Sequence, residues 1–216
     1  MNKLFYTTVT EIFTYELPKI KKSTFFGTLF PVEEKRQADD AIAMMRKKYY
    51  NATHHCYAYC IGLHVHTDLF GNVLIDAQHT KAYDDGEPTN TAGKPILSVL
   101  KGYPLHNVLL VATRYFGGTL LGVGGLIQAY TKTAQETLHH APLVQKEIYN
   151  TLELYSTYQQ TSLVAYLLEK YEVQVLAETY DTQIYQKLQI NRGLSEAFIQ
   201  EIRNKNLHTL KVTVLH

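Results

Sequence analysis

A glycine-rich stretch between Arg114 and Gly125 places the tightest limits on how this chain can fold. Its sequence is Arg-Tyr-Phe-Gly-Gly-Thr-Leu-Leu-Gly-Val-Gly-Gly. It follows the apolar run Val108–Ala112, which is typical of a strand buried on both faces. After the glycines, apolar residues recur at helical spacing, which predicts an amphipathic helix that ends near His140. Its apolar face consists of Leu126, Ile127, Tyr130, Ala134 and Leu138. The sequence therefore predicts a buried strand joined by glycine turns to an amphipathic helix.

The glycines allow two interpretations. Glycine permits positive φ and close approach of another segment, which fits tight turns that pack the helix on the strand. Amides at the helix start also attract anions, and Arg114 could add a charged contact to phosphate or carboxylate. Known nucleotide motifs do not fit, because Ile127 stands where the dinucleotide fingerprint has its third glycine and no Gly-Lys-Ser/Thr follows. Structural packing and an anion or nucleic-acid backbone site both remain open.

A second motif, Asp84-Asp85-Gly86-Glu87-Pro88, is predicted to be a loop because it combines turn-forming residues. Its three carboxylates could hold a hard cation or serve acid–base chemistry. They could equally cap the next helix or pair with Arg114, and the calcium-loop pattern is absent. That helix is predicted over Ala92–Leu100, with Thr91 as its N-cap.

Cysteine and histidine residues gather along one predicted strand, Cys56–Val65. Four candidate metal ligands would share one face of this strand: Cys56, Cys60, His64 and His66. Ten residues of strand span about 33 Å, so one strand cannot gather all four around a metal. No standard zinc spacing is present either. We therefore predict no metal and no cofactor, and keep His54 or His55 as a possible single functional histidine.

The charge balance argues against a broad nucleic-acid-binding surface, since the formal net charge is +1 over 216 residues. A local basic patch is still compatible with that total. The candidates for nucleic-acid or anion binding are Lys22, Ser23, Lys94, Arg114, Gly117, Gly118, Gly122, Gly124, Gly125 and Lys132. Each charged one, taken alone, is more often part of a solvated face.

The sequence also predicts a cellular compartment. The chain has two cysteines, and four residues of strand separate them by about 13 Å, too far for a disulfide. Such sparse thiol usage fits a reducing environment. The N-terminus lacks the apolar core of a signal peptide, and no apolar run approaches the ~20 residues of a membrane helix. We expect a cytoplasmic protein with no membrane partner.

The order of predicted elements divides the chain near residues 141–146. The first part begins with strands at Val9–Leu17 and Thr24–Phe30. The second part has the order βαββαβ, the ferredoxin-like pattern. In its last helix Ser195 is the expected N-cap, with Leu194 and Ile199 as a hydrophobic staple. We therefore predict an α+β fold with domains at residues 1–143 and 144–216.

Taken together, these motifs resemble those of the YigZ/IMPACT family. The resemblance is carried by Lys22-Ser23, Ala52-Thr53-His54-His55-Cys56, Asp84-Asp85-Gly86-Glu87-Pro88, Thr91-Ala92-Gly93, Arg114–Gly118, Leu121–Leu126 and Ala129-Tyr130. It covers most of residues 20–135. It implies an N-terminal β-sheet backed by helices, like the second domain of a ribosomal small-subunit protein. The βαββαβ tail resembles the C-terminal domain of the bacterial YigZ branch, which is similar to a domain of elongation factor G. One position differs from the family pattern: Asn90 stands where the family usually has a small residue after Pro-Ser/Thr.

The resemblance also implies a function, a non-enzymatic regulator of translation or stress response that binds RNA, the ribosome or a ribosome-associated factor. Eukaryotic IMPACT competes with a kinase for that kinase's ribosome-associated activator. One alternative is an enzyme for a small anionic substrate. Arg114 would be its anion clamp, His55 its proton carrier, and the acidic loop would supply acid–base groups or metal ligands, namely Asp84, Asp85 and Glu87. Another is a protein-binding adaptor that presents the glycine and acidic loops. The family-motif loop in these hypotheses consists of Asp84, Asp85, Gly86, Glu87, Pro88, Thr91 and Gly93. The oligomeric state does not follow from the sequence.

Overall fold

The structure, a computed structural model, describes residues 2–70, 72–205 and 207–215. The chain divides into two compact units: Tyr6–Gln145, here the N-terminal unit, and Lys146–His216 with Met1–Phe5, here the C-terminal unit. The start of the chain thus clusters with the second unit, whereas the predicted domain boundary assigned it to the first. A reciprocal pair of hydrogen bonds explains this, because the Leu4 amide donates to Asn191 Oδ1 and Asn191 Nδ2 donates to the Leu4 carbonyl.

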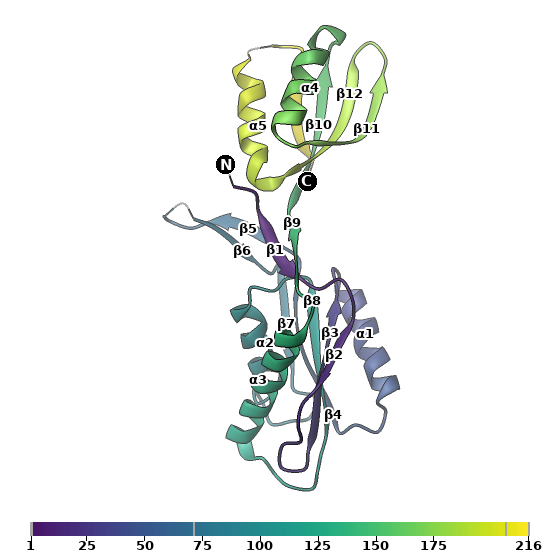
Figure 1. The fold of residues 1–216 in the computed structure, drawn as a ribbon, viewed down its shortest axis with the longest axis vertical. Helices are drawn as coiled ribbons and strands as arrows, with labels where there is room; N and C mark the ends of the chain where they lie inside the picture. The colour runs from purple at the N-terminus through teal and green to yellow at the C-terminus, as the bar shows by residue number, and fades with distance from the viewer. Residues whose placement is uncertain (1, 71, 206, 216) are drawn as a thin grey trace. The chain divides into compact units, whose positions relative to one another are not determined.

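A five-stranded antiparallel sheet forms the centre of the N-terminal unit (Figure 1). Its strands lie in the order β2 (Phe13–Glu16), β3 (Thr24–Pro31), β8 (Val108–Tyr115), β4 (His54–Ile61) and β7 (His79–Tyr83). The central strand β8 contains the apolar run of the sequence and is buried along all but its last residue. This is the strand expected to feed the glycine stretch.

Helices cover both faces of this sheet (Figure 1). On one face lies α1 (Lys35–Lys48), and on the other lie α2 (Gly93–Gly102) and α3 (Gly122–His140). Strand β4 shows why both faces are apolar. Cys56 and Ala58 point into the core beneath α2 and α3, whereas Tyr57 and Tyr59 point into the core beneath α1. The alternation of small and aromatic residues thus serves two cores at once.

Two predicted strands are shorter than expected. The predicted strand Val9–Leu17 is reduced to β2, because the chain bends at residues 10–11. A separate strand, β1 (Phe5–Thr8), lies before it in the chain. The predicted strand Cys56–Val65 ends at Ile61 because Gly62 has a φ of 75°. After that turn β5 (His64–Thr67) pairs instead with β6 (Val73–Asp76). The other small sheet consists of β1 and β9 (Val144–Glu147).

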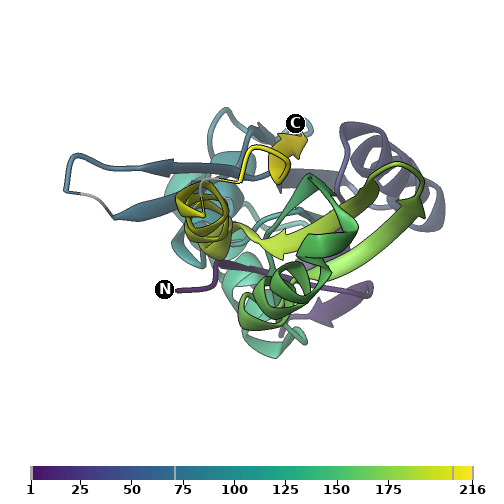
Figure 2. The ribbon, with the colours of Figure 1, turned by 90° about the horizontal axis from the view of Figure 1, so that it is seen from above.

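The C-terminal unit is a four-stranded antiparallel sheet with two helices (Figure 2). Its elements follow one another as β10 (Tyr149–Ser156), a 3-10 turn (Tyr158–Gln160), α4 (Thr161–Lys170), β11 (Gln174–Tyr180), β12 (Ile184–Asn191), α5 (Arg192–Asn204) and β13 (Lys211–Leu215). The strand order β11-β12-β10-β13 is that of the ferredoxin-like fold. The whole chain is therefore α+β.

The start of α5 differs from the predicted one. Asn191, not Ser195, is the N-cap, and its side chain accepts a hydrogen bond from the Gly193 amide at 3.0 Å. Ser195 lies one turn later, where its hydroxyl donates to the Arg192 carbonyl. Asparagine and serine are equally good caps, so local sequence could not choose between them. The contact between Asn191 and Leu4 decides it.

Across the described ranges of the chain, no helix is both long and apolar enough to cross a membrane.

Candidate functional site

The glycine stretch and the turn between β2 and β3 form one joined structure at an end of the N-terminal unit. Gly117 lies directly against the turn, so that a Cβ at this position would come within 2.1 Å of the Lys22 carbonyl carbon and oxygen. The Gly117 amide also donates to Ser23 Oγ at 3.2 Å. Close approach of two backbones explains this glycine, as the packing interpretation predicted.

The turn itself is held in an unusual backbone conformation. Ile20 and Ser23 exchange backbone hydrogen bonds of 2.9 and 3.0 Å around Lys21 and Lys22. Both lysines have positive φ, 43° for Lys21 and 70° for Lys22. Two-residue hairpin turns of this kind favour Asn-Gly, because other side chains are strained there. Backbone strain of this type tends to persist at functional sites, where the surrounding structure maintains it.

Arg114 lies beneath this end of the sheet and is buried, with 4% of its surface exposed. Its Nη1 donates to Glu87 Oε1 at 2.5 Å. The guanidinium carbon also lies 5.4 Å from the ring centroids of both Phe25 and Phe116. Its charge is therefore neutralised inside the protein, and Arg114 shapes the site from within rather than presenting a free cation to a ligand.

Glu87 is the centre of a buried polar cluster. The Tyr130 hydroxyl donates to the same Glu87 Oε1 at 2.7 Å, and His54 Nε2 lies 3.7 Å from it. The Cys56 thiol lies 3.4 Å from the Tyr130 hydroxyl and donates to the Asp84 carbonyl. Burial raises the pKa of the Cys56 thiol and of the Tyr130 hydroxyl far above their ordinary values. Both groups are therefore protonated donors, and neither is a nucleophile at neutral pH.

Asp84 caps helix α2. Its Oδ1 accepts hydrogen bonds from the amides of Ala92 and Gly93 at 3.0 and 2.8 Å, and its Oδ2 accepts one from Asn90. The predicted cap, Thr91, instead donates its hydroxyl to the Pro88 carbonyl. Asp84 lies nine residues before the first residue of the helix, so its cap is a tertiary contact that the local capping pattern cannot indicate.

Asp85 connects the acidic loop to two other elements. Its Oδ1 accepts a hydrogen bond from Arg46 Nη2 at 2.7 Å, and its Oδ2 accepts one from the His55 amide at 2.7 Å. The three carboxylates of the acidic loop thus point to three different sets of partners. Within residues 2–70, 72–205 and 207–215, no group of three or more His, Cys, Asp or Glu side chains is arranged to hold a metal ion.

The two adjacent histidines lie on opposite faces of β4. His54 faces the acidic loop, where its Nδ1 lies 2.8 Å from the Asp85 carbonyl. His55 is buried on the other face, 3.2 Å from Thr113 Oγ1, and burial lowers its pKa. Of the two, only His54 is close to Glu87.

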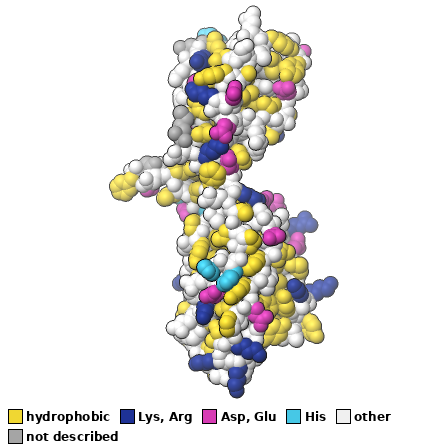
Figure 3. Space-filling model, viewed as in Figure 1, with side chains coloured by type: hydrophobic (Ala, Val, Ile, Leu, Met, Phe, Trp, Pro, Cys, Tyr) yellow, Lys and Arg dark blue, Asp and Glu magenta, His cyan; other side chains and the backbone are white. Residues whose placement is uncertain are grey.

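The exposed residues of the turn and the glycine stretch form what we call the tip surface. It consists of Lys21, Lys22, Phe116, Gly118, Thr119, Leu120, Gly122, Val123 and Gly124. Leu120 is 82% exposed and Val123 60% exposed. Figure 3 shows Lys and Arg side chains gathered at this end of the N-terminal unit. Helix α3 starts at this surface, so its first backbone amides point toward it. Among the described residues, no side chain caps the start of α3, and its first turn has no acidic residue.

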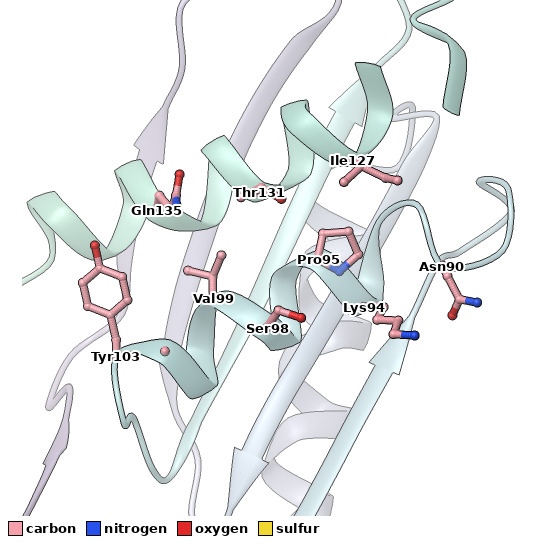
Figure 4. Close-up of a pocket in the computed structure, with 10 residues that line it drawn as sticks. Asn90, Lys94, Pro95, Ser98, Val99, Tyr103, Ile127, Thr131 and Gln135 are labelled. Atoms are coloured by element: carbon pink, nitrogen blue, oxygen red, sulfur yellow. The ribbon is translucent and has the colours of Figure 1, made fainter. Parts of the chain in front are cut away.

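Lys94 and Lys132 lie on the helices α2 and α3. Lys94 lines a groove of about 510 Å³ between α2 and α3, with Val99 in its floor and Ile127, Thr131 and Gln135 on its α3 side (Figure 4). Lys132 is exposed on α3 next to that row. Of the charged residues predicted to form one patch, Lys22 thus lies in the turn, Arg114 is buried beneath it, and Lys94 and Lys132 lie on α2 and α3.

Tyr130 is a member of the buried cluster to which the sequence analysis assigned no role, and Cys56 was considered there only as a metal ligand. A signal was available for Tyr130, which falls on the apolar face of its helix. A buried tyrosine hydroxyl almost always needs a polar partner. That partner could not be named from sequence, because Glu87 lies 43 residues away along the chain.

Comparison with known proteins places these residues in a wider group. The model of the Impact N-terminal domain matches residues 21–138. A protein from Haemophilus influenzae described as an IMPACT family member is 36% identical over 200 residues, covering 91% of each chain. The IMPACT family member YigZ from Escherichia coli is 31% identical over 162 residues, covering 75% of this chain and 74% of that protein. A crystal structure of a hypothetical protein superimposes over 100% of this chain and 99% of its own, with a TM-score of 0.66 and 24% identity.

Proposed function

The chain belongs to the IMPACT family, and from this premise we propose that it regulates translation or a stress response as a binding protein. The proposed target is RNA, the ribosome or a ribosome-associated factor, and the proposed place of action is the cytoplasm. The proposed contact region is the tip surface.

The strained lysine turn is the observation that carries this proposal. Lys21 and Lys22 both adopt positive φ, and Gly117 is packed against the turn where no side chain would fit. A relaxed Asn-Gly turn would form the same hairpin at lower conformational cost. Keeping two lysines in this position is readily explained if their ammonium groups contact a ligand.

The chemistry of the tip surface suits a phosphate backbone. Lysine ammonium groups neutralise phosphates, and helix amides bind them through the positive end of the helix dipole. Phe116 is 43% exposed beside these groups and offers a ring on which a base can stack. A ribosomal RNA segment would meet all three features.

The polar cluster favours a supporting role over catalysis. Glu87 is shared by Arg114 and Tyr130, Asp84 caps α2, and Asp85 is bonded to Arg46. Carboxylates committed to internal partners stabilise loops, whereas acid–base groups need access to a substrate. We therefore do not adopt the enzyme alternative.

A co-sedimentation experiment with purified bacterial 70S ribosomes tests the proposal. The Lys21→Glu/Lys22→Glu variant should bind about tenfold more weakly than the unchanged protein at low salt. The matched control is Lys35→Glu/Arg36→Glu, which reverses two exposed charges at the start of α1 on the other face of the sheet. The control should bind as the unchanged protein does.

Equal loss in both variants would mean that net charge, not the tip surface, controls binding. Absence of binding by the unchanged protein would contradict the ribosome as the target.

The adaptor alternative has one observation in its favour, the exposed apolar pair Leu120 and Val123. Binding that survives lysine reversal but is lost in Leu120→Ser/Val123→Ser would indicate a protein partner. Apolar rather than charged contacts would then dominate the interface.

A further inference from the structure

Among the described residues of the C-terminal unit, no helix covers one of the two faces of its sheet. Helices α4 and α5 pack on the face that contains Leu152, Leu154 and Leu188. The alternate residues of the two central strands, β10 and β12, point the other way. These are Thr151, Glu153, Tyr155, Tyr185, Lys187 and Gln189, all exposed or half-buried. We call this surface, together with Lys211 on the edge strand β13, the open face.

Two tyrosines form a pair at the middle of the open face. Tyr155 on β10 lies directly opposite Tyr185 on β12, and their ring centroids are 5.2 Å apart at an interplanar angle of 52°. Tyr155 is 36% exposed. The Tyr185 hydroxyl donates to Glu153 Oε1 at 3.0 Å, which holds its ring in place. Aromatic rings held rigidly on a sheet lose little conformational freedom on binding a planar partner.

Lysines flank the tyrosine pair. On the edge strand β13, Lys211 lies opposite Tyr155, and on β12 Lys187 lies opposite Glu153. Both lysines are exposed. Lys211 thus lies in the same cross-strand row as the two aromatic rings. Lys187 lies in a neighbouring row, opposite the carboxylate of Glu153.

We propose that the open face binds single-stranded RNA, with bases stacking on Tyr155 and Tyr185 and with Lys187 and Lys211 neutralising the neighbouring phosphates. Four-stranded sheets with surface aromatic residues bind single-stranded RNA in this way. The inference deepens the proposed function, because it adds a second surface and names the strand class.

The same features disfavour the other nucleic-acid class. Bases of a duplex are stacked on one another, so their faces are not available to Tyr155 or Tyr185. A duplex would instead need a broad array of cations, whereas the open face has two lysines and one glutamate. Glu153 is better suited to accept a hydrogen bond from a base amino group than to meet a phosphate.

Fluorescence anisotropy with labelled RNA decamers tests the inference on the full chain. The probes are a single-stranded decamer of mixed sequence and the duplex of the same decamer with its complement. The Tyr155→Leu/Tyr185→Leu variant should bind the single strand about tenfold or more weakly. The Tyr155→Phe/Tyr185→Phe variant keeps both rings and should bind within about threefold of the unchanged protein.

A second pair of variants tests the inference independently, in case the leucine variant does not fold. Lys187→Glu/Lys211→Glu should weaken single-strand binding and make it less dependent on salt. Its control, Lys35→Glu/Arg36→Glu, should leave both quantities unchanged. Thermal unfolding of each variant shows whether its fold is intact.

The outcomes separate this inference from the tip surface. Tyr155→Leu/Tyr185→Leu should weaken binding of the single-stranded decamer by the same factor when it is combined with Lys21→Glu/Lys22→Glu. This result is expected whether or not the protein co-sediments with ribosomes. Equal binding by the leucine and unchanged proteins would overturn the inference, as would equal or stronger binding of the duplex. Equal loss in the phenylalanine variant would overturn the stacking of bases on the rings.

Discussion

Glu87 and Arg114 form a buried ion pair that joins the acidic loop to the end of the central strand. The Nη1–Oε1 distance is 2.5 Å, and neither side chain is more than 5% exposed. Two motifs of the family resemblance, Asp84–Pro88 and Arg114–Gly118, thus meet at a single contact. The pair lies directly beneath Phe116, so it supports the tip surface without forming part of it.

Removing one member of this pair should strongly destabilise the N-terminal unit. Glu87→Gln leaves a buried guanidinium without its counter-charge, and such losses cost about 3–5 kcal/mol. Urea unfolding of Glu87→Gln, Arg114→Met and the double variant measures the cost. The double variant should lose less than the sum of the single variants, because it buries no unpaired charge. Strict additivity would contradict the coupling.

Relaxing the lysine turn should stabilise the fold and weaken binding. In Lys21→Asn/Lys22→Gly the turn takes the residues that its backbone prefers, and the free energy of unfolding should rise by about 1 kcal/mol. Ribosome or RNA binding should fall at the same time, because both ammonium groups are lost. Thermal unfolding and co-sedimentation of one preparation measure the two effects. Unchanged binding would remove the lysines from the proposed contact region.

Two glycines of the same stretch should respond in opposite ways to alanine. Gly117→Ala places a methyl group within 2.1 Å of the Lys22 carbonyl, so it should displace the turn and lower stability by several kcal/mol. Gly124→Ala is the matched control, since nothing lies within 4 Å of its new methyl group and its position is helical. It should stabilise α3 by about 0.5–1 kcal/mol. Chemical denaturation distinguishes the two, and equal effects would contradict the close approach.

Acidification should destabilise the N-terminal unit through two buried histidines. Burial lowers the pKa of His55 and of His106 below the ordinary value of 6.5. The unfolded chain therefore binds protons at these sites before the folded protein does, and stability falls as pH drops through about 6.5. His55→Gln/His106→Gln should flatten the decline in unfolding free energy between pH 7 and pH 5. An unaltered decline would assign it to other groups.

The roles of the acidic-loop carboxylates could be predicted from the sequence only as a set of alternatives. The sequence predicted a loop whose carboxylates would cap a helix, pair with Arg114, bind a cation or act in catalysis. The structure assigns the cap to Asp84 and the pairing to Glu87. Those two roles depend on residues 8 and 27 positions away along the chain. No local pattern encodes such separations.

The elements that depend on short-range periodicity and backbone geometry could be predicted from the residues alone. The buried strand β8, the amphipathic helix α3 and the βαββαβ order follow from apolar spacing, because each spacing buries one face or both. The family also followed from its ordered motifs, and the match over residues 21–138 confirms it.

Tertiary structure alone decided which residues meet. It joined Asn191, the α5 cap, to Leu4, brought His54 near Glu87 and His55 near Thr113, and paired Tyr155 with Tyr185 on the open face. It also packed Gly117 on the lysine turn, which keeps Lys21 and Lys22 strained. These contacts join segments distant in sequence, and their energies depend on burial that exists only once the sheets have formed.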